Sequence, residues 1–413
     1  MSDIPFIKLL KNKNYFMYFI SNMISPIGDN LFNIAVTWYM INKTNSIAPI
    51  GIVGGLSLTA KIFFGPFVGV LVDKASRKSL CITCDIVRAV LIGILMFFIF
   101  ADYHMIFTYL TIFIVEFVDL FYRPSITSIL SNIVDEDLIV GAFSLNGFMN
   151  YFTSFIGVSL GGIFSQYMNV YVVLLCNAST FIVSAIAVSF ICLKEDLLKE
   201  SSFNDETEGF FYGLKSSITY IKSKKFILKF MIVTFISNIS YTIIYGLIPA
   251  IAKNVFNSPV IYSALQIGVA MGSSIGLFII GNLHLKKVGK AYILSSFLSG
   301  GVILFFSFAK YNILAIILIF LFGFVDTATI PIFSYNQKQI DDKFRGRVIS
   351  ITNTFILSGS ALMNYVIAIF SSKINLHAMY LLATVLLILS GMLGFLFTEI
   401  RMAKFKSADL IQS

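Results

Sequence analysis

The sequence predicts an all-α membrane protein with twelve transmembrane helices, and three observations lead to this fold class. Of 413 residues, 57% are apolar and only 12% are charged, and the mean hydropathy is +0.88. A soluble domain has about 25% charged residues, so this chain lacks the charge to cover a surface in water. The apolar residues form long unbroken runs, and basic residues gather between alternate runs. Lipid is therefore the expected solvent.

The apolar runs are long enough for helices that cross a membrane. A helix rises about 1.5 Å per residue, so about 20 residues span about 30 Å of hydrocarbon. The runs do not alternate, and they are longer than a barrel strand of about 9–11 residues. Because backbone groups in lipid must bond within their own segment, each run predicts a helix. The twelve runs are 14–41, 48–72, 80–100, 105–130, 140–165, 170–193, 230–252, 260–283, 291–309, 312–335, 348–371 and 374–397.

The basic residues predict the orientation of these helices. With the N-terminus in the cytoplasm, the segments on that side hold 23 of the 30 Lys and Arg residues. Three more lie within helices, and the outer loops hold the other four: Lys43, Lys253, Lys310 and Lys373. Since basic residues stay on the cytoplasmic side, both termini are expected there, in a bacterial cell membrane. The net charge of +9 is then a topology signal and not a nucleic-acid site.

The longest polar stretch divides the chain into two halves. It covers residues 194–229, and its second part, 209–224, places apolar residues at helical spacing. That spacing predicts an amphipathic helix on the inner membrane face. We therefore expect a six-helix bundle over 1–193, a cytoplasmic linker over 194–229, and a second six-helix bundle over 230–413.

An internal repeat relates the two halves. Phe117-Val-Asp119 recurs as Phe324-Val-Asp326, and Pro124 recurs as Pro331, both with an offset of 207 residues. The same offset maps Gly69 onto Gly276 and Asn146 onto Asn353. Both halves run in the same direction, which predicts a parallel repeat about an axis along the membrane normal.

Five ionisable residues are expected near the middle of the membrane. A charge there costs about 2.5–3.5 kcal/mol even on a lenient insertion scale, so such residues are functional candidates. Four acids against one lysine favour a cationic guest, and an acid that gains and loses a proton could exchange it for that guest. Two static alternatives stay open: an Asp119–Arg123 pair one helical turn apart, and neutralisation of Asp29 or Glu116 by Lys61. The five residues are Asp29, Lys61, Glu116, Asp119 and Asp326.

The cytoplasmic end of the second run predicts a gating loop. Its glycine lets a neighbouring helix approach closely, and the charges that follow can form contacts that break when the conformation changes. Asp85 and Arg88, three residues apart on the next helix, predict a structural or gating pair. The gating residues are Gly69, Asp73, Arg77 and Lys78, with Asp135, Glu136 or Asp137 as expected partners.

These motifs resemble a known family. Gly69 to Lys78 resembles the loop between helices two and three of the major facilitator superfamily, although Ser76 stands where that loop usually has Gly. The string from Phe64 to Lys78 also resembles the macrolide and multidrug efflux branch. So do Asp85 with Arg88, Gly28-Asp29 with Thr37-Trp38, and Arg345-Gly-Arg-Val-Ile-Ser350. Val158 stands where drug antiporters often have Pro.

The resemblance implies a fold and a function. The fold is two six-helix bundles around a central cavity lined by helices one, four, seven and ten. Asp29, Glu116, Asp119 and Asp326 fall on three of those helices. The function is secondary active export of small amphipathic, cationic compounds by alternating access with proton antiport. The expected partners are a small-molecule substrate, a proton or sodium ion and the bilayer, and the expected state is a monomer without cofactor.

Rival functions remain open. One is an importer of the same fold, or a transporter of lipids or siderophores. A membrane enzyme would need a nucleophile or a metal set, and His104, His284 and His377 lie apart at loop edges. Cys81-Ile-Thr-Cys84 has metal-binding spacing but no second cysteine pair. A phosphate-binding loop is also missing, which excludes ATP hydrolysis by the chain itself. A receptor would need larger loops for a recognition domain.

Overall fold

The computed structural model describes residues 9, 11–134, 138–193, 207–283, 286–341 and 344–405. Within these residues the regular structure is helical and contains no strand, which confirms the predicted all-α fold class. Two compact units are present, one of Met1–Glu200 with Ser258–Ser263 and one of Ser201–Asn257 with Ala264–Ser413. The exact limits expected for the bundles and the linker stay predictions.

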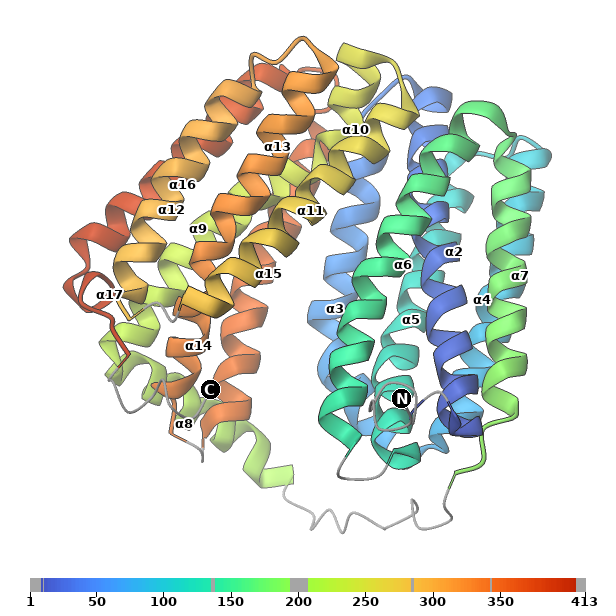
Figure 1. Ribbon diagram of the computed structural model, residues 1–413, viewed down its shortest axis with the longest axis horizontal. Helices are drawn as coiled ribbons and strands as arrows, with labels where there is room; N and C mark the ends of the chain where they lie inside the picture. Colours follow the sequence, from blue (N-terminus) through green and yellow to red (C-terminus); the bar gives the residue numbers. More distant parts are fainter. Residues whose placement is uncertain are drawn as a thin grey trace. The chain divides into compact units, whose positions relative to one another are not determined.

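Unit 1 contains six long helices, whose ends lie within about four residues of the predicted runs. Asn12 starts the first helix, because its side chain accepts hydrogen bonds from the backbone N–H groups of Asn14 and Tyr15. Asn45 ends that helix in a left-handed conformation with φ of 48°. The helices are α2 (Lys13–Thr44), α3 (Ala48–Lys74), α4 (Arg77–Phe100), α5 (Met105–Ile133), α6 (Ile139–Tyr167) and α7 (Val170–Ser189) (Figure 1).

The remaining elements lie in unit 2, except that the first residues of α11, up to Ser263, belong to unit 1. The first of these elements, α8, lies where the sequence predicts an amphipathic helix, and it packs against α9 and α15. In order they are α8 (Thr207–Ser223), α9 (Lys225–Gly246), α10 (Ile248–Ile251), η3 (Ala252–Phe256), α11 (Pro259–Leu283), α12 (Val288–Phe306), α13 (Asn312–Asp326), η4 (Thr327–Thr329), α14 (Ile330–Lys338), α15 (Arg345–Ile369), α16 (Leu376–Leu396) and α17 (Thr398–Arg401).

Within the described residues, ten helical segments are both long and apolar enough to cross a membrane. Two of the ten are composite: α9 continues through η3, and α13 continues through α14. The helices α2 and α6, of 32 and 29 residues, are also long but are not among these ten segments. The predicted number of twelve spans therefore stays a prediction for these two helices.

Close helix packing depends on glycine in both units. A Cβ atom on Gly157 in α6 would lie 2.5 Å from the backbone oxygen of Ile27 in α2. A Cβ atom on Gly272 in α11 would lie 2.1 Å from the backbone oxygen of Phe320 in α13. Both distances are too short for a side chain, so these helix pairs approach backbone to backbone, as membrane helices with small residues do.

The repeat is visible in the packing but not in helix continuity. In unit 1, α4 packs against α5 and α7, and in unit 2, α12 packs against α13 and α16. Pro124 lies inside an unbroken α5, whereas the 3₁₀ turn η4 interrupts the equivalent span just before Pro331. Proline removes one backbone donor, and the two units accommodate that loss differently.

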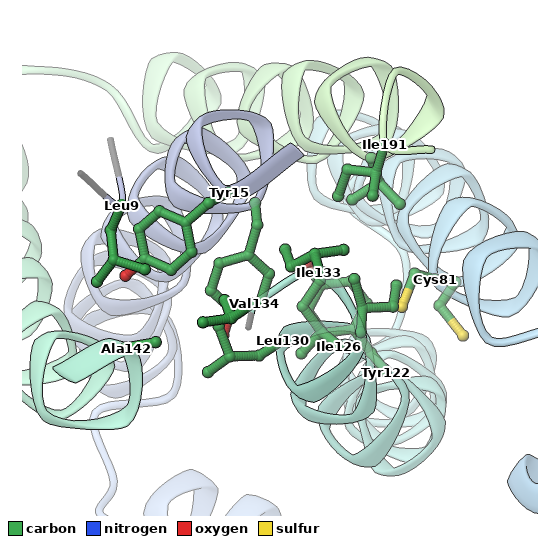
Figure 2. Packing of buried hydrophobic residues seen from close by; sticks show 14 residues of the cluster. Leu9, Tyr15, Cys81, Tyr122, Ile126, Leu130, Ile133, Val134, Ala142 and Ile191 are labelled. Atoms are coloured by element: carbon green, nitrogen blue, oxygen red, sulfur yellow. The ribbon is translucent and has the colours of Figure 1, made fainter. Parts of the chain in front are cut away.

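One apolar core cluster of unit 1 joins α2, α4, α5, the start of α6 and the end of α7 (Figure 2). Cys81 and Cys84 are free thiols buried in this cluster, and Cys81 is labelled in Figure 2. Both cysteines are therefore packed in the apolar core as small hydrophobic residues are.

Candidate functional site

The most buried basic side chain described in unit 1 is that of Arg88, on α4. Its side chain is 2% exposed and lies between two rings, 4.2 Å from the centroid of Tyr122 and 4.4 Å from that of Phe181. Arg88 Nη2 donates to Asp85 Oδ1 at 2.5 Å, one helical turn away. The predicted Asp85–Arg88 pair is therefore formed, and it is buried.

Hydroxyl groups fix this pair in place. Ser184 Oγ on α7 donates to Asp85 Oδ2 at 2.6 Å and lies 2.8 Å from Ser21 Oγ on α2. The Tyr122 hydroxyl lies 3.2 Å from Ser21 Oγ and 3.3 Å from Ser184 Oγ. Four helices thus converge on one buried polar network. Both oxygens of Asp85 are hydrogen-bonded, as a buried carboxylate requires.

Arg88 also joins two of the predicted mid-membrane acids. Its Nη1 donates to Asp119 Oδ1 on α5 at 3.1 Å and lies 3.9 Å from Asp29 Oδ2 on α2. The second distance is an ion pair beyond hydrogen-bond length. The expectation that Lys61 is the sole cation among these acids is wrong. Arg88 and Arg123 lie among them as well, because side chains from α4 and α5 reach the same level.

Asp119 and Glu116 each have a basic neighbour. Arg123 Nε donates to Asp119 Oδ2 at 2.5 Å, so the pair one turn apart on α5 is formed. Lys61 Nζ on α3 lies 3.9 Å from Glu116 Oε2. Of the two acids that Lys61 could neutralise, Asp29 and Glu116, its partner is therefore Glu116. Asp29, Lys61, Glu116 and Arg123 are all partly or largely exposed although they lie within long helices.

Asp326 lies in a different environment in unit 2. It is the last residue of α13, directly before η4, and its Oδ1 accepts a hydrogen bond of 2.6 Å from the hydroxyl of Tyr241 on α9. The ring centroids of Tyr241 and Tyr245 lie 6.3 and 5.9 Å from the ring centroid of Phe322. A tyrosine donor here takes the place that guanidinium groups have beside Asp119.

The predicted gating residues lie at the junction of α3 and α4. Gly69 and Asp73 are in the last turns of α3, and Arg77 is the first residue of α4. Lys78 Nζ donates to the backbone oxygen of Ile191 at 2.7 Å, just beyond the end of α7. A cation at the end of a helix is stabilised by the helix dipole, which explains this backbone partner. The expected acidic partners, Asp135, Glu136 and Asp137, lie outside the described residues.

Several members of the network carried no signal in the sequence analysis. Tyr122, Phe181, Ser184 and Tyr241 are common residue types in apolar helices, and only the packing brings them to the charges. One signal was available: a buried arginine needs more than one acceptor, and Asp85 alone could not supply them.

Membrane-length helices that hold charged side chains inside their span are typical of polytopic membrane transporters. Within that class, the chain belongs to the major facilitator superfamily, whose family model, described as Major Facilitator Superfamily, matches residues 18–362. The family consists of membrane transporters, and the chain is one of them.

Bacterial proteins are similar to this chain over most of its length. An uncharacterized MFS-type transporter of Bacillus subtilis, YkuC, is 24% identical and covers 90% of this chain and 89% of its own. The putative bacilysin exporter BacE of Bacillus amyloliquefaciens is 24% identical, with 82% of each chain covered. Macrolide efflux protein A of Streptococcus pyogenes is 20% identical, with 95% and 98% covered.

Solved structures share the fold. The nucleoside transporter NupG has a TM-score of 0.70 at 15% identity and covers 93% of this chain and 98% of its own. A bacterial homolog of the human lysosomal transporter Spinster, in an inward-facing state, has a TM-score of 0.69 at 12% identity, with 96% and 99% covered. At these identities the likeness concerns the fold, and it agrees with the predicted major facilitator fold.

Proposed function

We propose that this chain exports small amphipathic cations across the cell membrane by alternating access, in exchange for protons. The observation that carries the proposal is the set of partly exposed charges inside membrane-length helices of unit 1. Facing hydrocarbon would cost each of them several kcal/mol. A water-accessible path beside them avoids that cost, and a path beside acids suits a cationic guest.

The balance of charge supports a cationic guest even when Arg88 and Arg123 are counted among the bases. Within unit 1, the acids of the candidate site outnumber the bases by four to three. The acids are Asp29, Asp85, Glu116 and Asp119, and the bases are Lys61, Arg88 and Arg123. A bound monocation therefore meets a net negative site.

Asp29 is the acid that we assign to proton exchange. Its carboxylate is partly exposed and lies 3.9 Å from Arg88, so it is attracted to the guanidinium without being held by a hydrogen bond. Asp85, by contrast, is fully buried and bonded through both oxygens. A loosely held, accessible carboxylate can release its charge to a proton, whereas a locked one cannot.

The names of the relatives support export as the direction. Two are called exporter or efflux protein, for bacilysin and for macrolides. The orientation with both termini in the cytoplasm is part of the proposal, with the substrate entering from that side. Gly69, Asp73, Arg77 and Lys78 are proposed to form the inner gate.

The test uses everted membrane vesicles with an imposed pH gradient, scanned over hydrophobic cations and macrolides. We expect gradient-dependent uptake that Asp29→Asn reduces by about tenfold or more, with smaller losses for Glu116→Gln and Asp326→Asn. Asp102→Asn is the matched control, because it removes a carboxylate that lies in the turn after α4 and pairs with Lys43. Full uptake in the triple variant would remove proton exchange from the proposal.

Accumulation of a dye in whole cells distinguishes export from import. Cells that express the chain should accumulate less of a transported dye than cells without it. Greater accumulation in energised cells would instead establish the importer, and transport of a lipid or siderophore alone would establish the other rival.

A further inference from the structure

The carboxylate of Asp119 is shared between two cations of very different mobility. Its Oδ1 accepts from Arg88 Nη1 at 3.1 Å, and its Oδ2 accepts from Arg123 Nε at 2.5 Å. Asp119 itself is mostly buried, with 16% of its side chain exposed. The two arginine side chains differ: 2% of Arg88 is exposed and 75% of Arg123.

Arg88 cannot leave Asp119 without breaking a buried network. It is enclosed by the rings of Tyr122 and Phe181 and bonded to Asp85, which Ser184 holds in turn. Removing one partner of such a buried ion pair strands the other charge away from water. Oδ1 of Asp119 therefore stays bonded to Arg88.

Arg123 can leave at little cost. It sits one helical turn from Asp119 on the same helix, and exposed ion pairs of this kind contribute little to stability. A charge so exposed within the long helix α5 would be costly to leave in lipid, so we expect the proposed water-accessible path to reach it. An exposed guanidinium on a mostly buried carboxylate marks the side from which another cation can arrive.

We propose that Arg123 is a tethered stand-in for the substrate's cationic group and sets the selectivity for charge. A cationic substrate displaces Arg123 and takes its place on Asp119 Oδ2, while Arg88 stays on Oδ1. When no substrate is bound, Arg123 neutralises the carboxylate, so the empty site does not expose an unpaired charge. A neutral compound cannot displace it. The inference rests on the proposed function, because it concerns how that transporter recognises a cation.

The test measures binding of tetraphenylphosphonium, a permanent monocation, to the purified full chain in lipid nanodiscs. Removing the competitor with Arg123→Gln should lower the dissociation constant about two- to fivefold, in line with the strength of exposed ion pairs. Arg123→Lys keeps a competing cation and should bind as the wild type does. Because Arg123 is exposed, its replacement disturbs few contacts, and thermal unfolding verifies that each variant is folded.

Two further variants distinguish displacement from a general change of charge. Lys61→Gln removes the same charge beside Glu116 and should tighten binding less than Arg123→Gln. In an Asp119→Asn background, Arg123→Gln should no longer tighten binding, since the contested carboxylate is gone.

Equal tightening by Lys61→Gln, or tightening that persists without Asp119, would overturn the stand-in role and leave cation export intact. The same holds if Arg123→Gln leaves the affinity unchanged. A wild-type chain that neither binds nor transports tetraphenylphosphonium, or any other cation of the scan, would overturn both the inference and the proposed function.

Discussion

The two units solve one packing problem with different chemistry. In unit 1, Ser21, Ser184 and Asp85 connect α2, α7 and α4. In unit 2, Ser237, Ser390 and Tyr292 connect α9, α16 and α12. The Ser237 and Ser390 hydroxyls lie 2.8 Å apart, and those of Ser390 and Tyr292 lie 2.6 Å apart. With the repeat offset of 207 residues, Asp85 corresponds to Tyr292 and Arg88 to Ser295.

The difference separates packing from function. Unit 2 joins its three helices through neutral hydroxyl groups, so a buried ion pair is not required to build this junction. Unit 1 carries the same junction with an added aspartate and arginine, and burying those charges costs free energy. The charges in unit 1 therefore serve something besides packing, in agreement with a role for Arg88 in holding Asp119 and attracting Asp29.

The largest expected effect comes from removing only one partner of the buried Asp85–Arg88 ion pair. Arg88→Met leaves Asp85 as an uncompensated buried charge, which should lower the stability by about 3–5 kcal/mol. The equivalent change in unit 2, Ser295→Ala, removes one hydrogen bond of 2.8 Å to the backbone oxygen of Val325 and should cost about 1 kcal/mol. Thermal unfolding of both variants in the same detergent gives the comparison. Equal losses would contradict the distinction between the units.

The next prediction makes unit 1 neutral, as unit 2 is. Asp85→Asn combined with Arg88→Met removes both charges and keeps a side chain that can bond to Ser184. Because a buried ion pair can often be replaced by neutral groups at little cost, the double variant should recover most of the stability lost by Arg88→Met alone. Transport should fall about tenfold or more, since Asp119 and Asp29 lose their fixed guanidinium. A stable and fully active double variant would show that the charges are dispensable.

Much of this fold could be predicted from the sequence, because hydrocarbon thickness sets the length of each apolar run. The Asp119–Arg123 pair was also open to prediction, since residues four apart on a helix are neighbours. The contacts of Arg88 with Asp29 and Asp119 could not be predicted from the sequence. They join three helices, and the rotation of each helix about its axis depends on packing that one sequence does not reveal. The same limit hid the hydrogen bond between Tyr241 and Asp326.

Equivalent glycines in the two units sharpen the comparison at a smaller scale. Gly93 in α4 corresponds to Gly300 in α12. A Cβ atom on Gly93 has no neighbour within 4 Å, whereas one on Gly300 would lie 3.0 Å from Ile388 Cγ1. Alanine favours helix by about 1 kcal/mol over glycine, so Gly93→Ala should raise the unfolding temperature. Gly300→Ala should raise it less or lower it, and an equal rise would show that Ile388 yields without cost.

The smallest expected effect concerns an ion pair at the end of unit 2. Lys229 Nζ donates to Glu399 Oε2 at 2.5 Å, and this hydrogen bond holds the pKa of Glu399 below its usual value of 4.5. Because the pKa is lower in the folded state, the pair stabilises the chain above the unfolded pKa and loses that contribution as the pH falls through the folded one. Both side chains are partly exposed, so the contribution is less than about 1 kcal/mol.

Glu399→Gln should therefore lower the unfolding temperature slightly at pH 7, and the difference from the wild type should vanish once the pH falls below the pKa of Glu399 in the folded state. Lys229→Gln should remove most of this pH-dependent difference, because Lys229 is the main donor that favours the charged carboxylate and Thr398 Oγ1 remains as a second donor at 3.2 Å. A difference that persists in acid would assign the effect to the packing of the Glu399 side chain and not to its charge.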